Sequence, residues 1–259
     1  MENYLPLSLL NPQSATLPLA IGASFMLAGL VKGVVGLGLP TVAMGLLSLL
    51  MPPMEAAALL IVPSMVTNVW QLAAGPGLAP LLRRLWPMLL AVCGGTLAGG
   101  ALLPRDGGPA AAIALGLALV LYALAGLAAV RMAVPRAWEA RLAPLIGLAT
   151  GALTSATGVF VLPAVPYLQG LGLAKDALVQ ALGLAFTVST MALAASLALQ
   201  GAFSAGAASH SLYALLPALG GMLIGQWLRQ HLQPALFQQC FFAGLLLLGL
   251  HSTLRPLLA

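Results

Sequence analysis

Two glycine-rich interruptions in long apolar stretches are the first places where residue types and spacing suggest chemistry. They contain Gly36, Gly38 and Pro40, and Thr154, Ser155, Thr157 and Gly158. Glycine lets a ligand approach the backbone, and Pro40 suits the first turn of a following helix. Because free amides at a helix N-terminus carry partial positive charge, two such helix starts that meet inside the protein would form an anion site. Packing glycines and a proline kink are the alternative explanation.

Neutral polar side chains lie inside the apolar stretches at two further places. They are Thr67, Asn68 and Gln71 in one stretch, and Thr187, Ser189 and Thr190 in another. Hydroxyl and amide groups can donate hydrogen bonds to oxyanion oxygens without adding charge. The same groups also form hydrogen bonds between helices in membranes, which contribute about 0.6–2 kcal/mol each. Both interpretations stay open for these residues.

Lys32 is the one basic residue that falls well inside an apolar stretch. Its expected position is about 7 Å from the end of the segment, at 1.5 Å per helical residue. A lysine there can extend its stem to the membrane interface, or its ammonium can attract an anionic substrate. These two roles also stay open.

The residues that are absent narrow the chemistry. No acidic residue lies in the middle of an apolar stretch, which disfavours a sodium or metal cation as substrate. Glu55 and Asp176 lie where helices should begin, and the helix dipole stabilises a carboxylate there. We find no metal-ligand cluster and no nucleotide-binding motif, and we expect no cofactor. An intramembrane enzyme with Ser155 as nucleophile and His210 as base is a weaker hypothesis, because no third group positions them.

The composition indicates where these residues are placed. Of 259 residues, 61% are hydrophobic and only 6% are charged. A soluble domain carries about 25% charged residues, so this chain could not cover its surface with solvated groups. This excludes a soluble enzyme, a nucleic-acid-binding protein and a disordered chain. We expect an all-α, polytopic membrane protein in contact with the lipid bilayer, because the apolar runs lack the alternation of barrel strands.

Ten apolar segments can be drawn along the chain. They are 17–37, 40–51, 54–75, 85–104, 109–132, 142–157, 159–170, 174–200, 207–228 and 234–254. Residues 17–51 as one helix would be about 52 Å long, far more than the ~30 Å membrane core, so we expect two elements that meet at a break. The expected organisation is a tail at 1–16, a first repeat at 17–132, a basic cytoplasmic linker at 133–141 and a second repeat at 142–259.

The distribution of positive charge predicts the topology. If all ten segments cross, one face receives Lys32, Arg83, Arg84, Arg131, Arg136, Arg141, Lys175 and Arg229, and the other receives Arg105 and Arg255. The basic face should be cytoplasmic. Five elements per half would invert the second half relative to the first. The segment Gly29–Gly33 aligns with Gly147–Gly151, which supports two inverted five-element repeats with interrupted first helices.

The two halves together resemble the TauE/SafE sulfite exporter family, also called the toluene-sulfonate uptake permease group. The stretches that carry the resemblance are 29–40 and 147–158, each followed by an apolar run with proline and then an Ala-rich helix opened by Glu55 or Asp176. The family shows a Gly-x-Gly-Gly-Gly run in each half. Here Gly38 is followed by Leu39–Pro40, and the second half keeps only Gly158.

The resemblance implies a secondary transporter in the bacterial inner membrane that moves small sulfur-containing anions such as sulfite, sulfonates or sulfoacetate by alternating access. It favours export, although the residues themselves assign no direction. A carrier of another small anion, or of a neutral or amino-acid-like solute, is the main alternative, and a membrane scaffold that transports nothing is another. We expect no nucleic-acid partner, and a homo-oligomer stays open.

Overall fold

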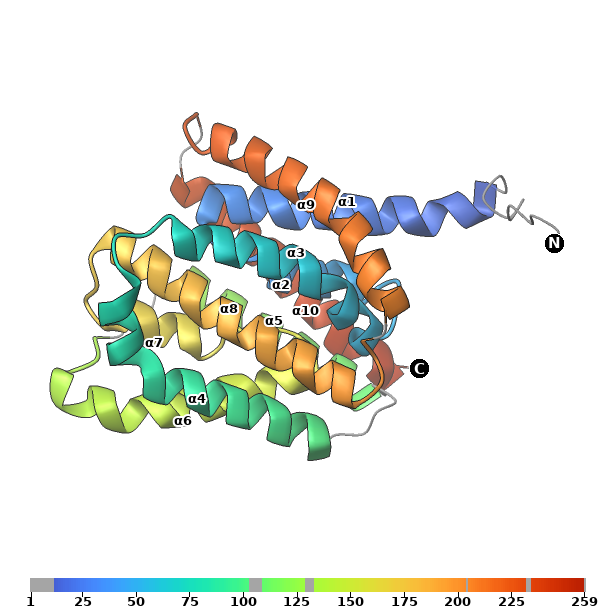
Figure 1. Ribbon diagram of the computed structural model, residues 1–259. Helices are drawn as coiled ribbons and strands as arrows, with labels where there is room; N and C mark the ends of the chain where they lie inside the picture. The colour runs from blue at the N-terminus through green and yellow to red at the C-terminus, as the bar shows by residue number, and fades with distance from the viewer. Residues whose placement is uncertain (1–11, 103–108, 129–132, 204, 232–233, 259) are drawn as a thin grey trace.

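The computed structural model describes residues 12–102, 109–128, 133–203, 205–231 and 234–258. All regular secondary structure in these ranges is helical, which confirms the predicted all-α class. The helices are α1 (Pro12–Val35), α2 (Leu39–Leu47), α3 (Pro53–Ala73), α4 (Leu78–Leu102), α5 (Pro109–Leu127), α6 (Arg136–Thr157), α7 (Ala164–Gly170), α8 (Lys175–Leu199), α9 (Ala205–Leu228) and α10 (Pro234–Leu258). They form one bundle (Figure 1).

Helix length separates the long elements from two short ones. Within the described residues, seven helices are long and apolar enough to cross a membrane, namely α1, α3, α4, α5, α8, α9 and α10. Helix α6 has 22 residues and is long enough to cross, but it is not among these seven, because its first two turns contain the charged residues Arg136, Glu139 and Arg141. Helices α2 and α7 have 9 and 7 residues. At 1.5 Å per residue they are about 14 and 11 Å long, so neither can cross a ~30 Å core by itself.

Four helix starts differ from the expected boundaries by five residues or more. Helix α1 begins at Pro12, inside the predicted tail at 1–16. Helices α4 and α6 begin at Leu78 and Arg136, before the predicted starts at 85 and 142. Their added first turns contain charged side chains, which are well tolerated where a helix leaves the hydrocarbon core. The second short helix begins at Ala164 instead of residue 159, and residues 159–163 form a non-helical connection after α6.

The helices pack in pairs that combine elements from the two halves of the chain. Helix α1 packs along α9, α4 along α6, and α5 along α10. Helices α3 and α8 contact each other and run in opposite directions, with α9 also against α3 and α4 against α8 (Figure 1). Each half of the chain therefore supplies helices to the packing of the other.

Glycines set the separation in two of these pairs. A Cβ added at Gly29 of α1 would lie 2.0 Å from the carbonyl oxygen of Ala218 on α9. A Cβ added at Gly151 of α6 would lie 2.4 Å from the carbonyl oxygen of Val92 on α4. No side chain fits at such distances, so the backbones of these helices are in direct contact. Small residues serve this purpose in membrane helices, where packing contacts hold helices together.

Most of the described basic residues lie at one end of the bundle, where α1 and α9 end and where α4, α6 and α8 begin (Figure 1). They are Lys32, Arg83, Arg84, Arg136, Arg141, Lys175 and Arg229. Arg255 lies in the last turn of α10 at the opposite end, and Arg105 and Arg131 lie outside the described residues. We call this the basic end. The exposed side chains of Trp86, Trp138 and Trp227 lie on α4, α6 and α9 toward this end, and exposed Trp70 lies near the end of α3.

One ion pair joins three helices at the basic end. Arg84 of α4 donates two hydrogen bonds to the carboxylate of Glu139 on α6, at 2.6 and 2.8 Å, and a third at 3.1 Å to the carbonyl oxygen of Leu171 after α7. The hydroxyl of Tyr167 also donates to the carbonyl oxygen of Glu139 at 3.2 Å. The hydrogen bonds from Arg84 lower the pKa of Glu139. This pair therefore fixes the starts of α4 and α6 against the end of α7.

The glycine contacts predict opposite effects for two alanine substitutions in α1. Gly29→Ala should lower the thermal unfolding midpoint of the purified protein in detergent, because overpacking against the α9 backbone costs about 1–3 kcal/mol. Gly22→Ala should leave the midpoint unchanged or raise it. Gly22 has open space around it, and alanine favours a helix by about 1 kcal/mol over glycine. Equal midpoints for the two variants would contradict the packing described here.

Candidate functional site

A cavity of about 1150 Å³ lies inside the basic end of the bundle. The last turns of α1, α3 and α9, the first turns of α8 and α10, and parts of α5 and α7 form its wall. Among the residues that the structure describes, the charged ones that line it are Lys32, Lys175 and Arg229, and none of the lining residues is acidic. The amide side chains in the wall are Gln71, Gln169, Gln226, Gln230 and Gln238. The wall is therefore cationic and rich in hydrogen-bond donors.

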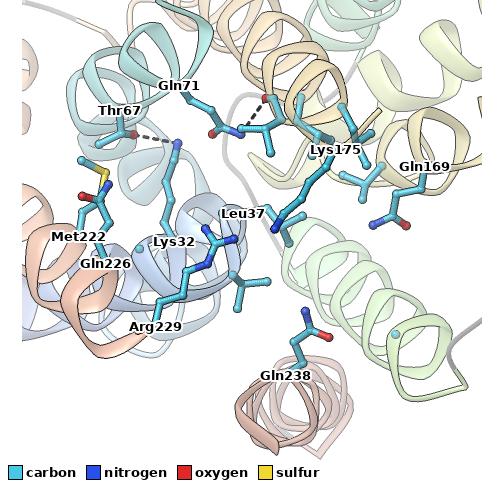
Figure 2. A pocket seen from close by; sticks show the side chains of 18 of the residues that line it. Lys32, Leu37, Thr67, Gln71, Gln169, Lys175, Met222, Gln226, Arg229 and Gln238 are labelled. Atoms are coloured by element: carbon cyan, nitrogen blue, oxygen red, sulfur yellow. Dashed lines mark hydrogen bonds between the residues drawn. The ribbon is translucent and has the colours of Figure 1, made fainter. Parts of the chain in front are cut away.

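Lys32 is buried at the inner side of this cavity, with 5% of its surface exposed. Its ammonium donates a hydrogen bond to the hydroxyl of Thr67 on α3 at 3.0 Å (Figure 2). It donates a second to the side-chain oxygen of Asn68, also on α3. The Asn68 amide donates in turn to the hydroxyl of Thr190 on α8, at 3.3 Å. This Lys32 network joins α1, α3 and α8, and it directs the ammonium at α3.

The partners of Lys32 are all neutral. The one salt bridge among the described residues joins Arg84 and Glu139, so no described carboxylate pairs with Lys32. Burying an ammonium without an opposite charge is expensive, even when neutral oxygens accept its hydrogen bonds. A negative ligand in the adjacent cavity would reduce that cost. The arrangement is therefore electrostatically suited to an anion.

Gln71 adds an amide to the cavity wall beside Lys32. Its amide nitrogen donates to the carbonyl oxygen of Val179 on α8 at 3.0 Å, while its buried side-chain oxygen has no hydrogen-bond partner. Gln180 of α8 makes the reciprocal contact, donating to the carbonyl oxygen of Leu72 at 3.0 Å. These two glutamines hold the end of α3 against the start of α8, and Gln71 lies close to Thr67 in the wall (Figure 2).

The first break reaches the cavity only in part. Gly36 and Leu37 line the cavity, and Gly36 has a φ of +83° with open space where a Cβ would be. Gly38, with a φ of +107°, packs against Val31 and Phe241. Pro40 stands in the first turn of α2, as predicted, and is buried. The positive φ angles explain why glycine is needed at positions 36 and 38.

The second break does not line this cavity. The hydroxyls of Thr154, Ser155 and Thr157 donate to carbonyl oxygens of the preceding turn, those of Thr150, Ala152 and Leu153, at 2.6–2.8 Å. Gly158 ends α6 with a φ of +69° and lies against Met44 of α2 and Ala57 of α3. The structure therefore does not bring the two breaks together around the described cavity. An anion site formed by both stays a prediction.

The hydroxyls of α8 are also mostly satisfied locally. Thr187 and Thr190 donate to the carbonyl oxygens of Gly183 and Phe186, both at 2.7 Å, and Ser189 is buried. Of the three, Thr190 contacts the Lys32 network, through Asn68. Ser155 forms no hydrogen bond with His210, which is exposed in α9. The described residues contain no cluster that could hold a metal ion.

Sequence reasoning did not assign Lys175, Arg229 or the glutamines of α7, α9 and α10 to a site. The available signal is that Lys175 and Arg229 flank apolar segments, and in a sequence that pattern indicates only the orientation of the chain in the membrane. Figure 2 shows both side chains directed into the cavity from different helices. Only the packing of α8, α9 and α10 around one space brings them together.

The Lys32 network predicts an energetic coupling between Lys32 and Asn68. Asn68→Ala should destabilise the protein by about 1–3 kcal/mol, because the buried ammonium loses an acceptor. In a Lys32→Met background the same substitution should cost clearly less. Thermal unfolding of the four proteins of this double-mutant cycle in detergent measures the coupling. An equal loss in both backgrounds would contradict the network.

The family pattern described as "Sulfite exporter TauE/SafE" matches residues 21–252, which is most of the chain. No curated protein and no solved structure gives a match. The chain therefore belongs to the TauE/SafE family, whose members are membrane transporters and not enzymes.

Proposed function

We propose that this TauE/SafE transporter moves small sulfur-containing anions such as sulfite, sulfonates or sulfoacetate, by alternating access. The observation that carries the proposal is the buried Lys32 ammonium, whose described partners are neutral and which lies in a cavity wall whose described residues include no acidic one. A cation substrate would be repelled by Lys32, Lys175 and Arg229. An oxyanion would instead meet positive charge and several amide donors.

In the proposed bound state, the anion accepts a hydrogen bond from Lys32 at the inner end of the cavity. Gln71 and the backbone at Gly36 lie in the same wall and are placed to contact it. Thr67 and Asn68 hold the ammonium in position. A second conformation would open the cavity at the opposite end of the bundle. We assign to that conformation the residues of the second break, Thr154, Ser155, Thr157 and Gly158, and the α8 hydroxyls of Thr187 and Ser189. Gly38 and Pro40 would hold the start of α2 in place in that conformation.

Two inverted repeats would supply the second state. Exchanging the halves maps α1 onto α6, α3 onto α8, α4 onto α9 and α5 onto α10. Under this exchange the α1–α9 pair becomes the α6–α4 pair, whereas the α3–α8 and α5–α10 pairs map onto themselves. Each of these helix pairs is in contact in the structure. The matched motifs also have matched roles. Gly33 contacts the α9 backbone, and Gly151 contacts the α4 backbone. This support favours repeats at 17–132 and 142–259 that exchange conformations.

The basic end is the cytoplasmic end in this proposal. Lys and Arg concentrate in cytoplasmic loops, and tryptophan is enriched at membrane interfaces. The cavity would then open to the cytoplasm of a bacterial cell, where an exporter collects its substrate. The start of α1 and the end of α10 both lie at the other end of the bundle, which would be external (Figure 1).

Transport measurements on Lys32→Gln test the function. In proteoliposomes, kcat/KM for labelled sulfite or an organosulfonate should fall by about 10- to 100-fold, because a hydrogen bond to a charged group contributes about 1.5–3 kcal/mol. Arg255→Gln, which removes a charge at the opposite end, is the matched control and should transport normally. A thermal unfolding scan establishes that Lys32→Gln is folded.

Two results would overturn this function. Transport of a neutral solute with an unchanged rate in Lys32→Gln would favour the amino-acid-like or neutral substrate. The anion assignment fails if a panel of sulfur oxyanions is neither transported by the wild-type protein nor raises its thermal unfolding midpoint.

Labelling of single cysteines tests orientation and inversion together. In a Cys93→Ser, Cys240→Ser background, Leu50→Cys lies in the turn before α3 and Ala174→Cys lies just before α8. A membrane-impermeant maleimide should label Leu50→Cys on intact cells and should label Ala174→Cys only after lysis. Labelling of both positions from the same side would contradict the inverted arrangement, and the reverse pattern would contradict the proposed orientation.

A further inference from the structure

We propose that Lys175 and Arg229 form an anion-capture subsite at the mouth of the cavity, separate from the buried position at Lys32. This inference builds on the anion transport proposed above, and it assigns a role to residues outside the predicted site. The subsite would take small oxyanions, including sulfonates. Anions bound at this subsite would then enter the cavity from the basic end.

The first support is the convergence of two cations from different helices. Lys175 is the first residue of α8, and Arg229 follows the last residue of α9. Figure 2 shows both side chains directed toward the same space, with Gln238 of α10 facing it as well. Two like charges that face one space repel each other. An anion between them would be attracted to both, and this attraction would offset their repulsion.

The second support is the lack of an internal counter-ion. No acidic residue lines the cavity in the described part of the chain, and neither Lys175 nor Arg229 takes part in the one described salt bridge. Asp176 follows Lys175 in the sequence, but consecutive residues of a helix do not face each other, and Asp176 is not part of the wall. The positive charge at the mouth is therefore available to a ligand.

The third support is the separation from Lys32 in structure and in partners. The Lys32 ammonium is held by Thr67 and Asn68 of α3, in the first half of the chain. The mouth residues all come from the second half. A four- or five-atom oxyanion occupies about two or three water volumes, or about 60–90 Å³, which is far below the 1150 Å³ of the cavity. One anion at Lys32 therefore leaves room for another at the mouth.

The physical consequence is a raised local concentration of anions before binding at Lys32. A cleft lined by charge of one sign focuses the field and speeds the entry of opposite charges. The effect should be strongly salt-dependent, because the mouth is exposed and the Debye length falls from about 10 Å at 0.1 M to about 3 Å at 1 M salt. Neutralising the charges at the mouth should therefore change the KM for an anion more than it changes kcat.

The test uses chemical labelling of the full-length protein, so it does not depend on identifying the transported substrate. In a Cys93→Ser, Cys240→Ser background, Gln238→Cys places a thiol in the cavity wall. Two methanethiosulfonate reagents are compared, the anionic 2-sulfonatoethyl and the cationic 2-trimethylammonioethyl forms. The ratio of their labelling rates reports local potential, because the thiolate fraction affects both reagents equally and cancels.

The ratio should favour the anionic reagent, and adding Lys175→Gln and Arg229→Gln should lower it several-fold at low salt. The difference should disappear at 1 M salt. Lys175→Arg with Arg229→Lys keeps the charges and should retain the ratio, and Arg255→Gln is the control at the opposite end. A ratio that is unchanged by the double neutralisation would overturn the subsite.

Transport kinetics separate this proposal from the function on which it builds. For labelled sulfite at low salt, the double neutralisation should raise KM several-fold and leave kcat nearly unchanged, whereas Lys32→Gln should lower kcat/KM at all salt concentrations. Charge-dependent labelling together with normal transport by Lys32→Gln would retain the mouth subsite and reject the role of Lys32. An unchanged KM in the double variant would reject capture.

Discussion

One buried charge organises the centre of this protein. The Lys32 ammonium binds Thr67 and Asn68 of α3, and Asn68 binds Thr190 of α8, so a single network connects the first helix to the two helices that meet between the halves. Because all its partners are neutral, the network orients the charge without neutralising it. The same contacts that hold the helices together therefore leave positive charge available to the cavity.

Close contact between helix backbones stabilises the bundle around this network. In a soluble protein the hydrophobic effect would stabilise the core instead. Glycines of α1 and α6 contact carbonyl oxygens of α9 and α4, which lets long helices pack without large side chains between them. The Arg84–Glu139 pair fixes the ends of α4 and α6. These helix pairs are joined through α3 and α8, and the Lys32 network connects α1 to both of those helices.

Much of the fold could be predicted because its signals are local. Apolar length gave the long helices, glycine with proline gave the first break, and the spacing of Gly29 and Gly33 corresponds to a packed helix face. The site was only partly predictable. Lys32, Gly36 and Gln71 do lie in the cavity wall, and Asn68 and Thr190 stand behind Lys32. Thr154, Ser155 and Thr157 belong to the predicted second break, and their hydroxyls donate to carbonyl oxygens of their own helix, a local bond that no spacing rule predicts.

The sequence by itself determined that the chain belongs in a membrane and that its first long apolar stretch breaks at glycines, because hydropathy and backbone freedom are properties of single residues and short stretches. Only the tertiary structure decided which polar groups share a space. Lys175 and Arg229 lie 54 residues apart in the chain, and Lys32 is more than a hundred residues from either. They line one cavity because α1, α3, α8 and α9 end or begin at the same level of the bundle, and such coincidence arises from packing between distant helices.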